Sequence, residues 1–472
     1  MLRITNTFSG QKEPFVSGGD PVRFYVCGMT PKFHPHVGHA RIFVAADVIR
    51  RYLEYRGLRV YHVQNFTDID DKIIARASEE GITPADVAAK YTASYFEAMD
   101  ALNVLRAHEY PTVTGFMPQI IAFIEALIAK GYAYVADGDV WFAVERFPSY
   151  GALSGRHGAL DEGLVGARKE LEPGKRDPRD FALWKRAKPG EPAWDSPWGP
   201  GRPGWHIECS TMVRATLGDT IDLHGGGQDL IFPHHENERA QSEALLGHPF
   251  VRYWVHVGLV TTGGEKMSHS LLNFRTVQEV LAHHEPMALR LYLLQTHYRA
   301  PLAFREEAVA AAARGLARLR AALEPLAAPA APLAGGAPDG APSGGELAAR
   351  ARARFETAMD DDFNTAAALA ALFDLAAELN ARRQRAPADP EIAAGQAVLR
   401  ELAGVLGLDL TPRPGVTAAR AAVEPFIELL LAVRQELRRA RQWALADRIR
   451  DGLRELGVIV EDRPDTTTWR FE

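Results

Sequence analysis

Cysteine is scarce in this sequence: only Cys27 and Cys209 occur among 472 residues. A scaffold held together by disulfides is therefore excluded, and a reducing compartment is expected. Long apolar runs are also missing, since no segment approaches the ~20 residues that a membrane helix requires. The N-terminal stretch is polar and interrupted by charge, without the apolar core of a secretory signal. These absences predict a cytoplasmic protein that does not contact a membrane.

An excess of positive charge is absent too. Lys and Arg total 54 against 60 Asp and Glu, which gives a net charge of −6. Any nucleic-acid contact must therefore come from a local patch. The segment 434–454 offers one, because seven arginines there stand against three acids and leave a net charge of +4. Such a segment is often a solvated helix face, but arginine also suits phosphate contacts.

Two common glycine-rich phosphate loops are missing as well. The sequence has no Gly-x-x-x-x-Gly-Lys-Ser/Thr and no Gly-x-Gly-x-x-Gly, so simple P-loop and dinucleotide-binding proteins lose support. The composition that is present, 47% hydrophobic and 24% charged residues, is that of a globular protein. The length is enough for about three domains.

The N-terminal pattern predicts a βαβ unit. Residues 22–27 favour a strand, a helical pattern runs from His39 to a closing Gly57, and residues 59–65 favour the next strand. Two strands joined by a crossover helix are typical of a parallel sheet.

Later segments predict additions to this unit. A helix is expected over 116–130, followed by a hairpin around Asp137-Gly138 and a Gly-, Pro- and Trp-rich insertion over 146–204. Strands are expected over 220–223 and 251–260. Residues 326–345 have the composition of an Ala/Pro/Gly linker, and the chain beyond them is mainly helical in pattern.

Four segments carry side chains suited to chemistry. The first is His36-Val37-Gly38-His39, at the start of the first predicted helix. The N-terminus of a helix attracts anions, two imidazoles there can donate to phosphate, and Gly38 leaves room for a flat base. Taken alone, the segment fits a polar helix cap better than a phosphate site. The second is Lys266-Met267-Ser268-His269-Ser270 after two glycines, a cationic loop that could close on a triphosphate or simply be solvated.

The third set combines Cys27 and Cys209 with His234 and Glu238, which lie four residues apart and share a face if helical. Cys, His and Glu are zinc ligands, but 182 positions separate the two cysteines, so only the fold could join them. Two buried free cysteines are the alternative. The fourth set is His224-Gly225-Gly226-Gly227-Gln228-Asp229, where glycines permit close ligand approach after a strand and Asp229 could accept from a hydroxyl or an ammonium.

In this order, the segments resemble the class I aminoacyl-tRNA synthetases, and among them the cysteinyl-tRNA synthetase family, over nearly the whole chain. His36–His39 is similar to the His-Ile-Gly-His motif and Lys266–Ser270 to the Lys-Met-Ser-Lys-Ser motif. The other matching stretches are Tyr25–Gly28, Thr67–Lys72, Gly204–Ser210, His224–Gly227, Phe232–Glu238 and Met359–Thr365.

The resemblance implies an α/β fold. A Rossmann-like parallel-sheet domain is split by a connective insertion, and a mainly helical C-terminal region binds tRNA. The expected division is 1–110 and 205–260 for the two catalytic halves, 111–204 for the insertion, 261–325 for a stem-contact region with the Lys266 loop, 326–345 for the linker, 346–408 for a helical tRNA-binding domain and 409–472 for a small anticodon-binding domain.

The implied activity is ATP-dependent ligation of L-cysteine to tRNA(Cys) through a cysteinyl-adenylate. Zn²⁺ would select the substrate thiolate over the serine hydroxyl, and Mg²⁺ would accompany ATP. No obligate protein partner is implied, and a monomer is expected. The metal ligands would be Cys27, Cys209, His234 and Glu238. Catalytic and ATP-binding roles would fall to His36, Gly38, His39, Lys266, Ser268 and His269, and cysteine binding to Gly28, Thr30, Thr67, Trp205, His224 and Asp229.

Two departures from the family pattern keep alternatives open. His269 replaces the second lysine of its motif, and Leu272 replaces a usual glycine. The first change is either tolerated, because His269 still donates hydrogen bonds, or weakens stabilisation of the transition state, because histidine is largely neutral near pH 7. A catalytically weak tRNA-binding paralogue is one alternative. The other is a ligase that joins cysteine to an amino sugar, as in mycothiol synthesis, although it has no need of the long tail after residue 346.

Overall fold

A computed structural model describes residues 1–156, 173–262, 265–266, 274–324, 345–411, 414–462 and 467–471. The chain forms two compact units, Met1–Leu410 and Thr411–Glu472, which are described separately. In the described residues, none of the helices combines the length and the apolarity needed to cross a bilayer.

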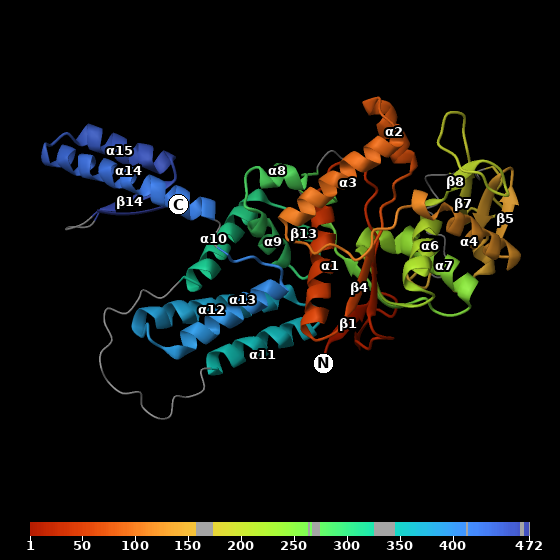
Figure 1. Cartoon of the computed structure of the whole chain (residues 1–472), viewed down its shortest axis with the longest axis horizontal. Coiled ribbons are helices and arrows are strands. Elements are labelled where there is room, and N and C mark those ends of the chain that lie inside the picture. The colour runs from red at the N-terminus through yellow and green to blue at the C-terminus, as the bar shows by residue number, and fades with distance from the viewer. Residues whose placement is uncertain are drawn as a thin grey trace. The chain divides into compact units, whose positions relative to one another are not determined.

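The larger unit is built on a four-stranded parallel sheet (Figure 1). Its order is β10 (Val251–Val257), β9 (Ile221–Gly227), β3 (Val22–Val26) and β4 (Val60–Gln64). Helix α1 (Val37–Tyr55) crosses from β3 to β4, which confirms the predicted βαβ unit. Strand order reverses between β3 and β9, and ligands of such sheets bind in the crevice at the carboxyl ends of the strands beside this point.

Helices cover both faces of the sheet because its side chains alternate. Phe24 and Val26 join a core with α1, α3 (Pro84–Ala101) and α9 (Pro286–Leu294). Tyr25, between them, joins a core on the opposite face. The helices of that second core are α4 (Met117–Ala129), α6 (Trp205–Leu217) and α7 (Glu236–Leu246). The result is a three-layer α/β/α arrangement, which confirms the predicted α/β fold with a parallel sheet.

The insertion carries a second, antiparallel sheet of four strands in the order β5 (Ala133–Ala136), β6 (Asp139–Phe142), β7 (Phe181–Arg186) and β8 (Gly201–Pro203). Asp137 and Gly138 both have positive φ, 53° and 87°. Two such residues make the turn that matches the twist of a hairpin, so the predicted hairpin is confirmed.

Beyond the sheet, a short three-stranded sheet joins β11 (Val260–Thr262), β12 (Glu265–Lys266) and β13 (Leu302–Ala303). The predicted helical region is also confirmed, and most of the predicted linker lies outside the described residues. The remaining elements of this unit are β1 (Arg3–Asn6), β2 (Gln11–Pro14), α2 (Asp71–Glu80), α8 (Val277–Leu281), α10 (Glu306–Ala322), α11 (Glu346–Asp360), α12 (Thr365–Arg385) and α13 (Pro390–Val405).

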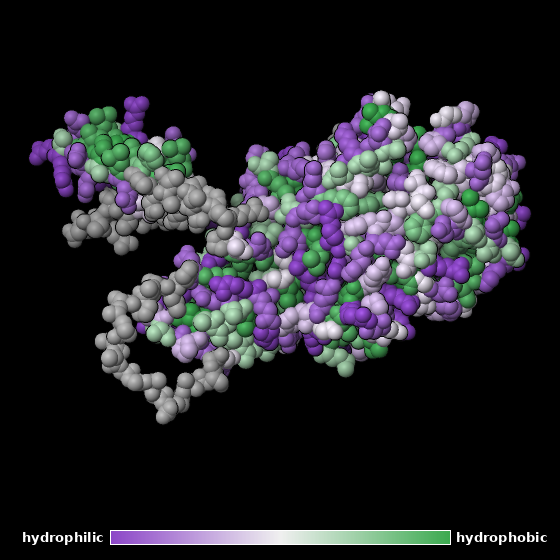
Figure 2. Space-filling view, viewed as in Figure 1, coloured by the Kyte–Doolittle hydropathy of each residue, from purple (hydrophilic) through white to green (hydrophobic). Residues whose placement is uncertain are grey.

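The smaller unit packs α14 (Pro414–Arg439) and α15 (Trp443–Glu455) against the hairpin of β14 (Val458–Asp462) and β15 (Thr467–Phe471). Its core contains Ile427, Leu453 and Val458. Large apolar side chains also remain on its surface, where Figure 2 shows a hydrophobic area over the two helices; they include Val423, Phe426, Leu429, Leu430, Val433, Trp443 and Leu445.

One strand is longer than predicted. The strand was expected over 220–223, before the glycines 225–227, but β9 runs through Gly227, because its main chain pairs with β3 as far as Gly225 and with β10 as far as Gly227. The segment from Pro233 fits a helix start, as its sequence indicates, because the π-helix Ile231–His235 leads directly into α7 at Glu236. Within this π-helix, Phe232 is extended with φ −138° and ψ 132°.

Candidate active site and metal centre

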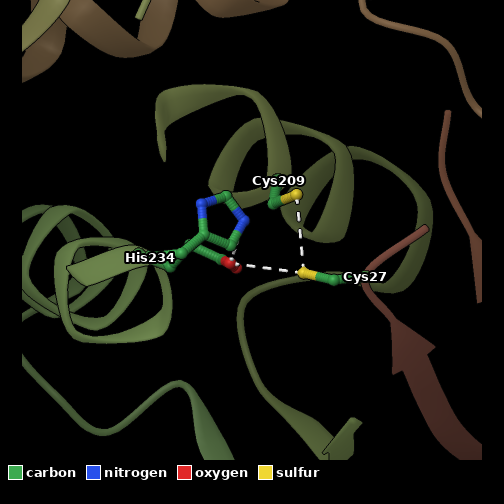
Figure 3. Close-up of side chains that lie close together, drawn as sticks. Cys27, Cys209 and His234 are labelled. Carbon is green, nitrogen blue, oxygen red and sulfur yellow. Dashed lines mark hydrogen bonds and ion pairs between the residues drawn. The ribbon is translucent and has the colours of Figure 1, made fainter. Parts of the chain in front are cut away.

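Four side chains from distant segments meet in the crevice at the carboxyl end of the parallel sheet. Cys27 directly follows β3, Cys209 lies on α6, His234 precedes α7 and Glu238 lies in the first turn of α7. All four are buried, and one ligand atom from each lies within 4.8 Å of the others. Figure 3 shows the thiols of Cys27 and Cys209 and the imidazole of His234 close together on their separate segments.

The distances within this quartet suit a metal ion. The two Sγ atoms are 3.7 Å apart, and Cys27 Sγ is 3.4 Å from Glu238 Oε1. His234 Nε2 lies 2.9 Å from the same carboxylate oxygen. Two sulfurs, one imidazole nitrogen and one carboxylate oxygen are ligands of Zn²⁺, so the residues fit that ion. The structure brings together all four residues that the sequence nominated for it.

The electrostatics of the quartet also favour a cation. Burial raises the pKa of the Glu238 carboxyl, but His224 and His234 more than offset this and hold it well below its usual value. The hydrogen bond from Cys27 lowers the pKa of the Cys209 thiol to about 6. Burial lowers the pKa of His234, yet Glu238 and then Cys209 raise it to about 10. Two buried anions next to a protonated imidazole are a place where a metal ion can replace the proton.

Two further histidines, His206 and His224, contact residues of the quartet. His206 Nδ1 is 3.0 Å from His234 Nδ1, which leaves His234 Nε2 facing Glu238. His224 Nε2 lies 2.9 Å from Glu238 Oε2. Such outer contacts fix the orientation of metal ligands. His224, which the sequence predicted in the cysteine pocket, is fully buried against Glu238.

Sequence reasoning missed His235 and His256. His235 Nε2 is 3.3 Å from Cys27 Sγ, and its Nδ1 is 2.7 Å from His256 Nε2. His256 in turn contacts Thr7 Oγ1 at 2.8 Å. A second set of four, Cys27, His224, His235 and Glu238, also has ligand atoms within 4.8 Å of one another. No local sequence pattern identifies His256 as a member of this network. Its position on β10, next to His235, does so.

Three residues nominated for the cysteine pocket lie around the quartet. The Trp205 ring stacks on His234 with centroids 4.3 Å apart and is 39% exposed, so it forms part of an open wall. Thr67 Oγ1 donates to Glu208 Oε2 at 3.1 Å, a buried carboxyl that the sequence did not reveal. Burial and then Cys209 raise the pKa of Glu208 well above its usual value. A Cβ on Gly28 would fall 1.6 Å from the Asn65 carbonyl oxygen, so only glycine fits there.

The remaining two residues predicted for the cysteine pocket are Thr30 and Asp229. Thr30 is half-buried, and its carbonyl accepts from the Lys32 amide. Asp229 is exposed, and a Cβ on Gly227 would lie 2.5 Å from its Oδ1 and 3.1 Å from Ile42 of α1. Asp229 therefore lies close to Gly227 at the end of β9.

His36 and His39 form a reciprocal cap at the start of α1. The His39 amide donates to His36 Nδ1 at 3.2 Å, the His36 amide donates to His39 Nδ1 at 3.3 Å, and the rings stack with centroids 3.7 Å apart. Because each Nδ1 accepts, the proton of a neutral ring sits on Nε2, away from the cap. Both rings therefore present an N–H donor at the helix N-terminus, where anions bind.

Gly38 is required by this stack. A Cβ at position 38 would lie 2.8 Å from Cε1 and 2.9 Å from Nδ1 of His36. Lys266 belongs to β12, where it pairs with Thr261 of β11. Ser268 and His269 lie outside the described residues, so the structure does not place them.

Three families match consecutive parts of the chain. Residues 15–314 match the class I (C) tRNA synthetase catalytic domain, residues 354–411 the DALR domain and residues 422–470 the cysteinyl-tRNA ligase anticodon binding domain. Cysteine–tRNA ligase of Moorella thermoacetica is 51% identical over 99% of this chain and 100% of its own. The enzymes of Pelotomaculum thermopropionicum and Dehalococcoides mccartyi are 50% and 48% identical, over 99% and 100% of both chains.

Solved structures agree on the fold. Mycobacterium tuberculosis methionyl-tRNA synthetase with methionyl-adenylate aligns with a TM-score of 0.60 at 18% identity, over 82% of this chain and 90% of that one. The ternary complex of Agrobacterium radiobacter K84 LeuRS with tRNA and LeuAMS gives 0.57 at 15% identity, over 84% and 85%. The catalytic-domain match over most of the chain, the end-to-end relatives and the class I fold together show that this chain belongs to the cysteine–tRNA ligase family of class I aminoacyl-tRNA synthetases.

Proposed function

We propose that this chain joins L-cysteine to tRNA(Cys) in two steps, with cysteinyl-adenylate as the intermediate. In the first step the cysteine carboxylate attacks the α-phosphorus of ATP and pyrophosphate leaves. In the second, a hydroxyl of the terminal adenosine of the tRNA attacks the activated carbonyl and AMP leaves. The observation that supports this best is the buried quartet of Cys27, Cys209, His234 and Glu238 at the switch point of the sheet.

The quartet addresses the specificity problem of a cysteine enzyme. An apolar pocket would separate cysteine poorly from serine or alanine, because such a pocket discriminates weakly between side chains of similar size. The four residues would hold Zn²⁺, which binds thiolate far better than hydroxyl. His206 and His224 keep His234 and Glu238 in position for it. The half-open Trp205 would form the entrance wall for the substrate side chain.

The start of α1 would bind the phosphates of ATP, with Mg²⁺ on the nucleotide. The Nε2–H groups of His36 and His39 point away from the cap that holds their rings, and they would donate to the α-phosphate and the leaving pyrophosphate. Lys266, from the neighbouring short sheet, would add a positive charge. No general base is needed, because a carboxylate is already deprotonated when it attacks.

The C-terminal part would contact the tRNA. We propose that residues 346–408 contact the body of the tRNA and that residues 409–472 contact its anticodon. The smaller unit offers an aromatic ring on which a single-stranded base could stack, since Trp443 is 56% exposed at the start of the arginine-rich α15.

Two measurements on the full chain test the proposal. The first is charging of a tRNA(Cys) transcript with labelled cysteine, ATP and Mg²⁺, with cysteine-dependent pyrophosphate exchange as the parallel assay. Exchange without charging would contradict the tRNA ligase and favour a ligase for a small acceptor such as an amino sugar. Absence of both activities would contradict adenylate formation itself.

The second measurement concerns the metal. We expect one zinc per chain, lost in His234→Ala and retained in His248→Ala, which removes an exposed histidine. Elemental analysis of the purified proteins gives the metal content. The zinc-edge X-ray absorption spectrum of the wild type should change on addition of cysteine and not of serine. A spectrum that cysteine leaves unchanged would contradict recognition of the thiolate by the metal.

A further inference from the structure

Arg41 is a fully enclosed cation two residues beyond the histidine pair of α1. Only 2% of it is exposed. Its guanidinium donates to main-chain carbonyl oxygens, to Leu259 at 3.1 Å, to His297 at 3.2 Å and to Ala300. Burial lowers the pKa of Arg41 to about 10, so the side chain stays charged near neutral pH. Among the described residues, this buried cation is held by backbone oxygens alone. Such an arrangement is costly, which indicates that Arg41 serves a purpose besides packing.

Two of the three carbonyls, those of Leu259 and Ala300, lie just before strands of the short sheet that carries Lys266. Leu259 immediately precedes β11, and its carbonyl also accepts from the Leu302 amide at 2.9 Å. Ala300 immediately precedes the Pro301–Leu302 step into β13, which pairs with β11 in parallel. Strand β11 in turn pairs with β12, in the register Thr261 to Lys266. Arg41 therefore connects the first turns of α1 to β11, the strand with which Lys266 pairs.

The segment after Lys266 returns to the same end of α1. The Val37 amide donates to the Arg275 carbonyl at 3.0 Å, and the Val277 amide donates to the Pro35 carbonyl at 2.8 Å. His36 and Thr276 face each other as an antiparallel bridge between these bonds. Residues 259 and 275–277, which flank the segment with Lys266, are thus both attached to the start of α1. The second attachment is made by main-chain hydrogen bonds, whereas the hydrogen bonds of the first come from the Arg41 side chain.

We propose that Arg41 is a positioning residue for adenylate formation: it fixes the strand of Lys266 relative to His36 and His39. Arg41 does not contact substrate. Its guanidinium sets the distance between the two groups of donors that would act on the phosphates of ATP. This inference rests on the proposed function, because it assumes that His36, His39 and Lys266 act on one nucleotide.

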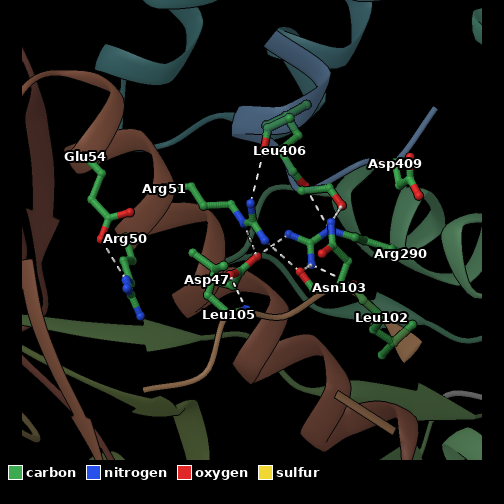
Figure 4. Close-up of polar contacts among 12 residues, drawn as sticks. Asp47, Arg50, Arg51, Glu54, Leu102, Asn103, Leu105, Arg290, Leu406 and Asp409 are labelled. Carbon is green, nitrogen blue, oxygen red and sulfur yellow. Dashed lines mark hydrogen bonds and ion pairs between the residues drawn. The ribbon is translucent and has the colours of Figure 1, made fainter. Parts of the chain in front are cut away.

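The test compares Arg41→Met and Arg41→Lys with Arg290→Met in cysteine-dependent pyrophosphate exchange. Arg290 is a matched control: it is fully buried and donates to the carbonyls of Leu406, Leu102 and Asn103 as well as to Asp47, which lies eight residues beyond His39 on α1 (Figure 4). Active sites are counted from the burst of adenylate, so kcat refers to folded enzyme only. Zinc content, the KM for cysteine and the melting temperature are measured on the same samples.

For Arg41→Met we expect kcat per active site to fall about 10- to 100-fold, the cost of a small misplacement of catalytic groups. The KM for cysteine and the zinc content should not change, because the quartet lies on other elements. Arg41→Lys keeps the charge and some of the donors, so it should recover part of kcat. Arg290→Met should lower the melting temperature and leave kcat per active site unchanged.

An unchanged kcat per active site in Arg41→Met would overturn the proposal, as would an equal loss in Arg290→Met. If Arg41→Met does not fold, Arg41→Lys decides in the same way, since a wild-type kcat in that variant is the overturning result. Failure of the proposed function looks different, because the wild-type chain itself would then show no cysteine-dependent exchange.

Discussion

Replacing Gly38 by alanine should reduce catalysis without unfolding the protein. The added Cβ would lie 2.8 Å from His36 Cε1 and 2.9 Å from Nδ1, closer than such atoms approach one another in folded proteins. The His36 ring must therefore rotate. It then leaves its stack on His39, and its Nδ1 no longer accepts the His39 amide at 3.2 Å.

The two consequences of this rotation differ in size. Loss of the N-cap acceptor costs about 0.5–2 kcal/mol of stability, but alanine returns up to about 1 kcal/mol through its higher helix propensity. The net change in the free energy of unfolding should thus be within about 1 kcal/mol. Loss of one aligned donor to the transition state costs more; from comparable donors we expect kcat to fall about 10- to 100-fold or further.

The assay is cysteine-dependent pyrophosphate exchange, with active sites counted and the melting temperature recorded. Gly404→Ala is the matched control, because Gly404 lies within α13 and a Cβ there would meet no atom within 4 Å. That variant should keep full activity. A Gly38→Ala enzyme with a lower melting temperature and a wild-type kcat per active site would refute the reasoning, since His36 would then serve only as a cap.

Three further predictions follow from other parts of the chain. Burial lowers the pKa of His62 to about 3, whereas unfolded histidine titrates near 6.5, so protonation of the unfolded chain should remove about 2 kcal/mol of stability at pH 5. His62→Leu should therefore lose less urea resistance than the wild type between pH 7.5 and 5. His248→Leu, which replaces an exposed histidine, should lose as much as the wild type. His269→Lys should raise the exchange rate at pH 8, where histidine is neutral and lysine charged, and an equal or lower rate would contradict this. Trp443→Ala should raise the KM for tRNA about 5- to 100-fold, the value of one stacked base, with exchange unaffected; a similar rise in the exposed Leu456→Ala would count against stacking.

Much of this protein follows from local sequence. The alternation around Phe24, Tyr25 and Val26 requires a sheet covered on both faces, and the helix over 37–55 supplies one cover, because local periodicity determines which face of an element is apolar. The hairpin at Asp137-Gly138 is equally local, since few residues adopt two successive positive φ angles. The position of His36 and His39 at the start of a helix could also be predicted, because helical periodicity is a local property of the sequence.

The tertiary structure decided what lies far apart in the chain. Cys27 and Cys209 are separated by 182 positions, and only the packing of α6 against the sheet beside the end of β3 places their Sγ atoms 3.7 Å apart. The fold also decided that His224 stands behind Glu238, that His235 and His256 continue the network, and that the glycines 225–227 belong to a buried strand. Periodicity assigns a side chain to a face, but the partner it meets there depends on which strand the chain places next to it, and that choice is made by the whole core.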